Sequence, residues 1–564
     1  MAKKGFIRGE AKKFDTIREM VALAAAENPD QTGFMYKAGK ECISVTYSEF
    51  AQMTYNLGQG LADCGFLGKE NRIACVAENS FNWIHTYVTV LQSDSVYVPV
   101  DPNLPVADLI NVLNHSGSTV VFCSAKFEKI FREHRHELPN VRKFVCFALE
   151  EDDGDFLSFE GLNRKGSALY EAGDREFDNH TPDHNETKLI VYTSGTTGNS
   201  KGVMLSEHNI VSGIYYGLQT SKIYTKCLSV LPYNHTYEMI PGILVAIHHR
   251  SVLCINDRIP NVMKNMQYFK PDYIYLVPAF VETFYKKIWA GIKKQGLEKK
   301  IKTAIKLSYG MRRLGIDMRK KLFGQITDNF GGNLREIVCG GAPLRPEVVE
   351  FFDAIGIDIL NGYGITECSP LVSVNQLETN NPKTVGYPLP CLEIRIYEPD
   401  EEGNGEICVK GDVVMLGYYK NKEATDEVLI DGWFHTGDFG RTDELGRIVI
   451  NGRKKNLIVL TNGKNIYPEE IEALIARVDY IKEVIVSGIK DESGGEIGLK
   501  AEVYLDPENK ETAEADNDTK TARLKADIAK VLEELPSYKR ISEIVIRDEE
   551  FAKNTSNKIK RNYN

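Results

Sequence analysis

Short apolar runs alternate with longer amphipathic stretches over about the first 450 residues of the chain. The apolar runs are NRIACVA, SVYVPV, TVVFCS, KFVCFAL, KLIVYTS, KCLSVLP, SVLCI, DYIYLVP, REIVCGG and IDILNGYG. Runs of this length, rich in β-branched residues, predict buried strands, and the stretches between them predict helices. The alternation predicts an α/β fold with layered, mostly parallel sheets.

The pattern changes in the last third of the chain. From residue 391 onward, the runs LEIRIYE, GEICVKG and RIVINGR are separated by turns, which predicts a small β subdomain. After Arg453 the pattern predicts a compact α+β unit. Its elements are a helix starting at Pro468, the strands KEVIVSGI and LKAEVYLD, the helix TARLKADIAKVLEEL and the strand EIVIRD. We therefore predict an N-terminal domain at 1–452 and a C-terminal domain at 453–564.

Composition narrows the class of protein. The 564 residues are 42% hydrophobic and 26% charged with a net charge of -10, which is typical of a multidomain globular protein and argues against a nucleic-acid binder. The eleven cysteines contain no C-x-x-C pair, as expected of structural thiols in a reducing compartment. The start MAKKGFIRGE lacks a signal-peptide core, and no apolar stretch reaches the roughly 20 residues of a membrane span. We expect a cytoplasmic protein.

The segment YTSGTTGNSKGVMLS, residues 192–206, carries the first chemical signal. It follows the apolar run Leu189-Ile190-Val191 and combines glycines and hydroxyl residues with Lys201, which suits a loop that binds a phosphate chain. It is not a Walker P-loop, because Ser200 stands where that motif requires glycine. A surface loop of the same composition is the alternative.

Three further clusters carry groups suited to a nucleotide. In NGYGITE, Tyr363 can stack on a base, Thr366 can donate to phosphate, and Glu367 can bind a hard cation such as Mg²⁺. In DGWFHTGDFG, Asp438 stands between glycine turns, where a carboxylate can accept from both ribose hydroxyls. CGGAPL follows a predicted strand and can let a flat ring lie against backbone. The alternatives are a solvated glutamate, an ordinary Asp turn and a plain turn.

Taken in order, these motifs resemble those of the adenylate-forming superfamily, and most of all the long-chain fatty acyl-CoA synthetases. The resemblance runs from VTYSEF at residue 45 to KIKR at 561, and its most specific parts are YTSGTTGNSKGVMLS, NGYGITE, GEICVKGDVVMLGYYKNKEAT, DGWFHTGD and GRKKNLIVLTNGKNIYPEEIE. It implies a small C-terminal domain that is mobile about a hinge near 453–456.

The resemblance also implies roles for individual residues. The ATP phosphates would be bound by Thr193, Ser194, Gly195, Thr196, Thr197 and Lys201. Mg²⁺ would be bound by Glu367. The nucleotide would further contact Gly341, Ala342, Pro343, Tyr363, Gly364, Thr366, Asp438 and Arg453. His235 in LPYNHTYE would line the acyl pocket, Lys455 would lie at the hinge, Gly463 would lie on the CoA path, and Lys558 would be catalytic. For His235, the alternative is an ordinary core histidine. The tail departs from the family in one place, with Asn557 where glycine is usual before Lys558.

The implied reaction is an ATP-dependent acyl-CoA synthesis in two steps. A carboxylate attacks the α-phosphorus of ATP to give acyl-AMP and pyrophosphate, and the thiol of CoA then displaces AMP. Fatty acids are the expected substrates, and the expected partners are small molecules. Three alternatives remain. The protein could load the phosphopantetheine arm of a carrier protein, it could be a ligase for aryl or other acids, or it could be an impaired family member that only binds nucleotide.

A basic amphipathic segment at 286–321 adds one expectation. It reads KKIWAGIKKQGLEKKIKTAIKLSYGMRRLGIDMRKK, with only Glu298 and Asp317 as acidic residues. Helices of this kind can rest on anionic membrane surfaces, where fatty acids partition. The alternative is a solvated helical face over the core.

Overall fold

The computed structural model describes residues 6–193, 200–461, 464–491, 494–507, 509, 517–553 and 559–561. The chain divides into two compact units. Unit 1 comprises Met1–Ile394, Val409–Phe434 and Glu444–Arg447, and unit 2 comprises Arg395–Cys408, His435–Asp443 and Ile448–Asn564. The boundary between residues 452 and 453 and the hinge beside it stay predictions.

The first sheet of unit 1 contains eight strands in the order β19-β9-β8-β4-β3-β5-β6-β7. Their bounds are β3 (Arg72–Val76), β4 (Val96–Val100), β5 (Val120–Cys123), β6 (Lys143–Cys146), β7 (Phe156–Ser158), β8 (Thr187–Thr193), β9 (Lys201–Ser206) and β19 (Gly417–Tyr418). The strands from β8 to β7 pair in parallel, while β9 and β19 are antiparallel to their neighbours. The prediction of a mostly parallel sheet is confirmed here.

Helices cover this sheet through regularly spaced apolar residues. Leu109 and Leu113 of α4 and Phe127 and Phe131 of α5 are buried in one core cluster with strand residues such as Val121. Each pair is four residues apart, which places both side chains on one helical face. The helices of this region are α1 (Ile17–Glu27), α2 (Tyr47–Asp63), α3 (Phe81–Leu91), α4 (Val106–Ser116), α5 (Ala125–Glu133), α6 (Phe159–Glu171) and α7 (Glu207–Thr220).

The second sheet of unit 1 contains nine strands in the order β16-β15-β14-β13-β12-β10-β11-β1-β2. Their bounds are β1 (Thr32–Ala38), β2 (Glu41–Thr46), β10 (Lys226–Ser229), β11 (Val252–Ile255), β12 (Tyr273–Leu276), β13 (Glu336–Cys339), β14 (Asp358–Gly364), β15 (Leu371–Val374) and β16 (Tyr387–Pro388). From β14 to β1 all pairs are parallel, so the carboxyl ends of these strands share one edge.

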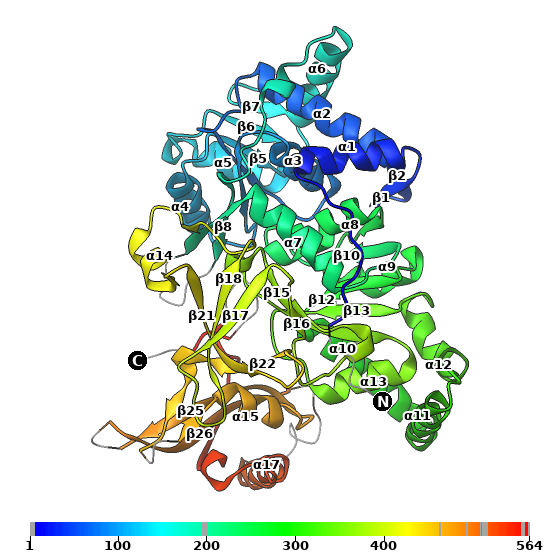
Figure 1. The fold of residues 1–564 in the computed structure, drawn as a ribbon, viewed down its shortest axis with the longest axis vertical. Helices are drawn as coiled ribbons and strands as arrows, with labels where there is room; N and C mark the ends of the chain where they lie inside the picture. The colour runs from blue at the N-terminus through cyan, green and yellow to red at the C-terminus, as the bar shows by residue number, and fades with distance from the viewer. Residues whose placement is uncertain are drawn as a thin grey trace. The chain divides into compact units, whose positions relative to one another are not determined.

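The helices near the second sheet include a turn of unusual geometry. Glu238–Leu244 forms a π-helix around Pro241, directly before α8. Such π segments are frequent at functional sites. The helices are α8 (Val245–His249), α9 (Val262–Phe269), α10 (Pro278–Lys294), α11 (Glu298–Arg313), α12 (Arg319–Thr327) and α13 (Pro346–Ile355), of which α10 to α13 lie together in Figure 1.

A five-stranded sheet has β17, β18, β21 and β20 in that order, with β22 paired to β21. The bounds are β17 (Leu392–Tyr397), β18 (Gly405–Gly411), β20 (Leu429–Ile430), β21 (Trp433–Thr442) and β22 (Ile448–Arg453), with α14 (Lys422–Val428) before β20. The predicted strands LEIRIYE, GEICVKG and RIVINGR correspond to β17, β18 and β22.

The remainder of unit 2 is an α+β structure, as the sequence predicts. It contains β23 (Ile458–Val459), β24 (Asn465–Ile466), α15 (Pro468–Ile475), β25 (Ile481–Lys490), β26 (Glu496–Leu505), α17 (Asn517–Val531) and β27 (Glu543–Arg547). One core cluster contains side chains from α15, β26 and α17, such as Ile471, Leu499 and Leu524. Among the described helices of the whole chain, none is long and apolar enough to cross a membrane.

Candidate active site

The predicted phosphate loop is anchored by the β8–β9 hairpin. Thr193 ends β8, Lys201 begins β9, and the two residues are register partners. The antiparallel ladder therefore fixes the position of Lys201 at the start of β9. Four of the predicted phosphate ligands lie outside the residues that the structure describes: Ser194, Gly195, Thr196 and Thr197.

The segment at residues 412–419 lies against this hairpin and is held on two sides. On one side, the Asn209 amide donates to the backbone oxygen of Asp412 at 2.7 Å. On the other, the backbone N–H of Met415 donates to the backbone oxygen of Glu367 at 2.8 Å. The segment therefore connects the helix that follows β9 to the region around Glu367.

Tyr418 of this segment contacts both a predicted phosphate ligand and the predicted metal ligand. Its hydroxyl donates to Glu367 Oε1 at 2.8 Å, and its ring centroid lies 4.9 Å from Lys201 Nζ. Burial, and to a lesser degree the neighbouring Glu367, raises the pKa of Tyr418, so the phenol stays a neutral donor. Tyr418 is not among the residues predicted from the sequence, although it lies within the motif GEICVKGDVVMLGYYKNKEAT.

Glu367 is suited to bind a hard cation. Its carboxylate takes its hydrogen bond from a neutral phenol, and among the described residues no lysine or arginine forms an ion pair with it. A half-buried carboxylate whose charge is not neutralised is an oxygen ligand of the kind that Mg²⁺ prefers. The residue is therefore not the fully solvated glutamate of the alternative hypothesis.

The turn that carries Thr366 and Glu367 depends on a glycine. Gly364 ends β14, and a Cβ atom at this position would lie only 2.6 Å from the backbone oxygen of Pro370. Because backbone cannot move aside cheaply, this close approach requires glycine. The turn continues as a short 3-10 helix at Thr366–Cys368.

The remaining nucleotide ligands predicted in unit 1 lie at the carboxyl edge of the second sheet. Tyr363 is buried near the end of β14, and the CGGAPL loop follows the neighbouring strand β13. In that loop, Gly341 has a φ of 88°, a left-handed conformation that favours glycine. Ala342 and Pro343 follow it and are exposed. The structure thus brings the predicted adenine-binding residues to one sheet edge.

His235 also lies beyond the carboxyl end of a strand in this sheet. It follows β10 and is half-buried. Two residues later, Tyr237 donates to the backbone oxygen of Val338 at 2.9 Å and so fixes the turn against β13. The predicted acyl-pocket histidine therefore lies on the same edge as the CGGAPL loop.

A buried carboxyl group follows His235 and was missed in the sequence. Glu238 begins the π-helix, is almost fully buried, and accepts a hydrogen bond from Ser229 at 2.5 Å. Burial raises its pKa to about 8, so the carboxyl group is protonated at neutral pH. Only the spacing HTYE could have pointed to this residue.

The predicted ribose-binding residues of unit 2 form an ion pair. Asp438 of β21 and Arg453 of β22 are register partners, and Arg453 Nε lies 2.8 Å from Asp438 Oδ1. The alternative of an ordinary Asp turn is wrong, because Asp438 is a buried strand residue. In this motif Gly432 and Gly437 have left-handed φ angles of 76° and 68°.

Lys455, the predicted hinge residue, lies in a short 3-10 helix at Lys454–Asn456. Burial, followed by the nearby cations Arg453 and Arg561, lowers its pKa. Gly463 and Lys558, the predicted CoA-path and catalytic residues, lie outside the described residues.

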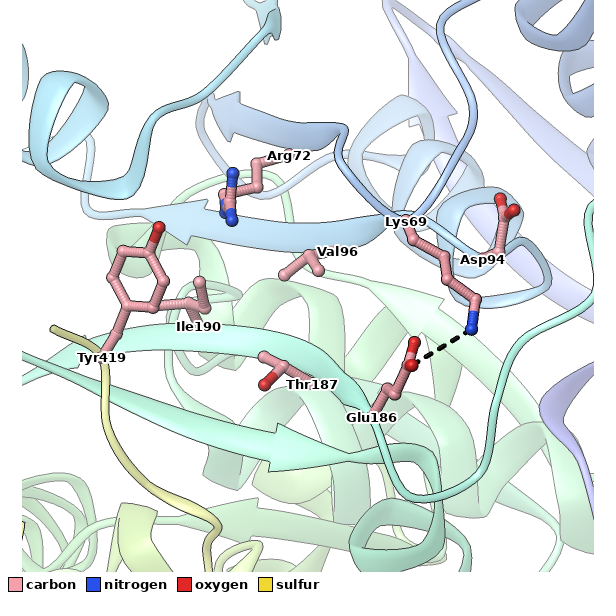
Figure 2. A pocket seen from close by; sticks show the side chains of 8 residues that line it. All are labelled: Lys69, Arg72, Asp94, Val96, Glu186, Thr187, Ile190 and Tyr419. Atoms are coloured by element: carbon pink, nitrogen blue, oxygen red, sulfur yellow. Dashed lines mark hydrogen bonds and ion pairs between the residues drawn. The ribbon is translucent and has the colours of Figure 1, made fainter.

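A pocket of about 250 Å³ in unit 1 is lined by Tyr419, at the end of the 412–419 segment, and by residues of the first sheet. Arg72, Val96 and Thr187 begin three neighbouring parallel strands, so the pocket is at the amino edge of this sheet (Figure 2). Lys69 and Glu186 form an ion pair of 3.1 Å at the pocket (Figure 2). None of the lining residues is among the predicted nucleotide ligands.

The chain belongs to the AMP-binding enzyme family. Residues 21–419 match the AMP-binding enzyme family, and residues 470–558 match the AMP-binding enzyme C-terminal domain. This family assignment confirms the resemblance found in the motifs.

Two relatives and one solved structure make the likeness specific. The chain is 30% identical over 477 residues to long-chain-fatty-acid–CoA ligase 6 of Mus musculus, covering 79% of this chain and 67% of that protein. It is 27% identical over 482 residues to fatty acyl-CoA synthetase B of Dictyostelium discoideum, covering 80% and 70%. The fold resembles the anthranilate CoA ligase AuaEII in complex with anthranoyl-AMP, with a TM-score of 0.74 at 17% identity over 97% of this chain and 96% of that chain.

Proposed function

We propose that this protein is an ATP-dependent, AMP-forming fatty acyl-CoA ligase. The observation that carries the proposal is the contact of Tyr418 with both Lys201 and Glu367, which places a cation and a carboxylate beside one hairpin. This is what a magnesium-bound polyphosphate requires: positive charge for the phosphates and an oxygen ligand for the metal. The named relatives are fatty acyl-CoA ligases, which supports fatty acids as the substrates.

In the first step, the carboxylate of the acid attacks the α-phosphorus of ATP and pyrophosphate leaves. Both reactants are anions, so the protein contributes chiefly by orienting them and by compensating their charge. A bound Mg²⁺ would share phosphate oxygens and offset their charge. Lys201 would donate to the phosphate chain, Glu367 would hold the metal, and Tyr418 would keep the carboxylate of Glu367 in place.

The nucleoside part of ATP would be held by two sets of residues. The edge formed by the CGGAPL loop and Tyr363 is suited to a flat purine ring, because a glycine backbone and an aromatic side chain can bracket it. Asp438 would accept from the ribose hydroxyls. Its ion pair with Arg453 keeps the carboxylate charged and oriented, which supports this role.

In the second step, the thiol of CoA would attack the acyl adenylate and release AMP. We assign the two steps to different orientations of a C-terminal domain at 453–564 that turns near 453–456. The placement of Lys455 in a short helix between β22 and β23 supports a pivot there. Lys558 would serve adenylation, and Gly463 would lie along the path of the pantetheine arm.

A panel of acids, scored by AMP release, tests this proposal. Fatty acids with ATP, Mg²⁺ and free CoA should give AMP and acyl-CoA, whereas benzoate, anthranilate and acetate should react more slowly. A preference for aryl acids would favour an aryl-CoA ligase. Transfer to a phosphopantetheinylated carrier protein but not to CoA would favour the carrier-loading alternative. Absence of ATP–pyrophosphate exchange with every acid would identify a nucleotide-binding protein without ligase activity.

We also propose that the basic segment at 286–321 contacts anionic membrane surfaces. The apolar side chains of Leu307, Leu314 and Ile316 are exposed, with Leu314 at 78%. The exposed cations on α10, α11 and α12 are Lys286, Lys287, Lys293, Lys294, Lys299, Lys300, Lys302, Lys306, Arg313, Lys320 and Lys321. Leu307 lies on α11, and Leu314 and Ile316 follow its end at Arg313, so exposed apolar side chains stand among cations, as expected of a segment that contacts lipid.

Vesicle sedimentation tests the membrane contact. The protein should bind vesicles containing phosphatidylglycerol more than vesicles of phosphatidylcholine alone, and added salt should weaken binding. The triple variant Lys299→Glu, Lys300→Glu, Lys302→Glu should bind less, while Lys126→Glu, Lys129→Glu on α5 should not. Equal sedimentation of both variants would mean that the segment is a solvated helical surface.

A further inference from the structure

Three metal-ligand side chains that the ligase reaction does not use converge on one face of the five-stranded sheet. Glu406 and Cys408 are two residues apart on β18, so they point to the same side. His435 lies on the neighbouring strand β21. One ligand atom from each residue lies within 4.8 Å of the other two. From this cluster we propose a binding site for a thiophilic divalent metal ion, of the zinc or cadmium type.

The distances fit tetrahedral coordination. His435 Nδ1 lies 3.2 Å from Glu406 Oε2 and 3.4 Å from Cys408 Sγ. With metal–ligand bonds of about 2.0–2.3 Å, tetrahedral zinc separates its ligand atoms by roughly 3.3–3.6 Å. The two distances from His435 Nδ1 are close to this spacing, and all three ligand atoms lie within 4.8 Å of one another. Cys408 is fully buried and the Glu406 side chain nearly so, which makes this a formed site rather than a surface cluster.

His435 Nδ1 faces the Glu406 carboxylate and the Cys408 sulfur together, at 3.2 and 3.4 Å. Without a metal ion, an Nδ1 hydrogen can be shared between these two acceptors, while the Cys408 thiol donates to the backbone oxygen of Glu406 at 3.8 Å. A metal ion would replace these weak contacts with bonds to the same three side chains.

The surroundings orient the ligands as metal sites require. Gly437 N–H donates to Glu406 Oε1 at 3.1 Å, which fixes the carboxylate and directs Oε2 to the cluster. The ring of Tyr397 lies edge-on to His435 with centroids 5.2 Å apart, which limits rotation of the imidazole. Outer contacts of this kind fix ligand geometry in metalloproteins.

Two cations compete with a metal ion for these ligands, because Arg395 contacts the Cys408 sulfur and Lys454 contacts Glu406. Lys454 Nζ donates to Glu406 Oε2 at 2.9 Å, and because its side chain is 53% exposed it can move into solvent when a metal arrives. The metal–sulfur bond forms with the thiolate, so binding releases the Cys408 proton to solvent. A ligand set with thiolate and imidazole selects zinc-like ions over Mg²⁺.

Titration of the full-length reduced protein with Co²⁺ and Cd²⁺ tests the site. We expect the visible spectrum of tetrahedral cobalt and a thiolate-to-cadmium charge-transfer band, both saturating with one equivalent. Cys408→Ser should abolish the charge-transfer band of that equivalent, and His435→Gln should weaken binding at least tenfold. Lys454→Met should tighten it several-fold by removing the competitor.

The control uses a pair of described thiols that lie together elsewhere in the chain. Cys123 and Cys146 have sulfur atoms 3.5 Å apart in the core of unit 1, so Cys146→Ser reports metal bound by those thiols. Binding that is lost in Cys146→Ser but kept in Cys408→Ser overturns the proposal, as does absence of any saturable binding to the wild type. Circular dichroism checks each variant for folding, and His435→Gln remains an independent test if Cys408→Ser does not fold.

Discussion

Tyr418 donates a hydrogen bond of 2.8 Å from its hydroxyl to Glu367 Oε1, while its ring faces the ammonium group of Lys201 at 4.9 Å. One neutral side chain thus orients the carboxylate and contacts the cation that we assign to the same phosphate chain. The phenol ring separates the two charges, so neither neutralises the other by direct pairing. Both remain available to a ligand that carries phosphate and metal together.

Tyr418→Phe should weaken the binding of Mg²⁺ without abolishing activity. The ring that faces Lys201 stays, but Glu367 loses the donor that orients it, and loss of an outer partner of a metal ligand typically costs 10- to 100-fold in affinity. We therefore expect the Mg²⁺ concentration for half-maximal AMP formation at saturating ATP to rise about tenfold. Tyr419→Phe is the matched control, and equal behaviour of the two variants would contradict the assignment.

Glu367→Gln should have a larger effect on the same measurement. Glutamine keeps the shape and can still accept from Tyr418, but it removes the negative charge that attracts the cation. The apparent requirements for Mg²⁺ and for ATP should both worsen, while the thermal unfolding midpoint stays near that of the wild type. Unchanged Mg²⁺ dependence at matched ATP would show that Glu367 does not bind the metal.

Lys558→Ala should separate the two half-reactions. The lysine is proposed to offset negative charge that develops during attack on the α-phosphorus, so adenylation measured by pyrophosphate exchange should fall by at least about 100-fold. Given synthetic acyl adenylate and CoA, the same variant should form thioester at close to the wild-type rate. Gly463→Leu should show the reverse by obstructing the pantetheine path.

Lys560→Ala controls for the general charge of the C-terminal tail. Lys560 is bound through its backbone N–H, which donates to the carbonyl of Ala552 at 2.7 Å, so removal of its side chain leaves this contact. Both half-reactions should proceed as in the wild type. If Lys558→Ala and Lys560→Ala lose the same activity, the tail contributes only general positive charge.

Chain length of the acid should govern kcat/KM. If the acyl pocket is apolar, each buried methylene contributes about 0.8 kcal/mol, which corresponds to roughly a fourfold gain. A series of straight-chain acids should therefore rise steeply and then reach a plateau where the pocket ends. The measurement is initial AMP formation at low acid concentration, and a flat series would exclude an extended apolar pocket.

Glu238 should make stability depend on pH. Its pKa is raised to about 8 in the folded protein, so the folded state keeps a proton that the unfolded chain releases near its ordinary pKa of 4.5. The stabilisation is therefore complete below about pH 4.5 and is lost as pH rises towards 8, by an amount on the order of a few kcal/mol. Urea unfolding between pH 5 and 8 measures this decline.

Glu238→Gln should reduce that decline, because glutamine does not titrate. Glu336 is a second buried carboxyl group whose pKa burial raises to about 8, so the wild-type curve contains both contributions. The double variant Glu238→Gln, Glu336→Gln should then be flatter than either single variant. If Glu238→Gln follows the wild-type curve at every pH, the carboxyl group does not titrate as proposed.

Local patterns were sufficient to predict most of the fold. The apolar runs NRIACVA and REIVCGG correspond to β3 and β13, and Pro468 begins α15 as expected of proline in a first turn. These elements are determined by nearby residues, because a buried strand needs a continuous apolar run. The hairpin of β1 and β2 was missed, since its run TGFMYKA and the segment ECISVT are only partly buried and have mixed polarity.

The candidate site was less accessible to sequence reasoning. Residue chemistry and the resemblance both pointed to Lys201 and Glu367, but their common partner Tyr418 lies in a separate segment, and no local pattern predicts that contact. Asp438 was expected between glycine turns, but it lies within β21, directly after Gly437 with its left-handed φ. Contacts between distant segments, and burial of polar groups such as Glu238, depend on tertiary packing.

The register between Thr193 and Lys201 has a consequence for protein engineering. The hairpin ladder continues from this pair back to Thr187 and Ser206, so the two ends of the connecting loop are set by strands that do not include the loop itself. Residues between the two anchors can be exchanged or lengthened as a cassette without changing which face of β9 carries the lysine. Chimeras joined at these two positions therefore change the residues between the anchors while β8 and β9 stay the same. The hairpin is a suitable place to insert the corresponding segments of other family members.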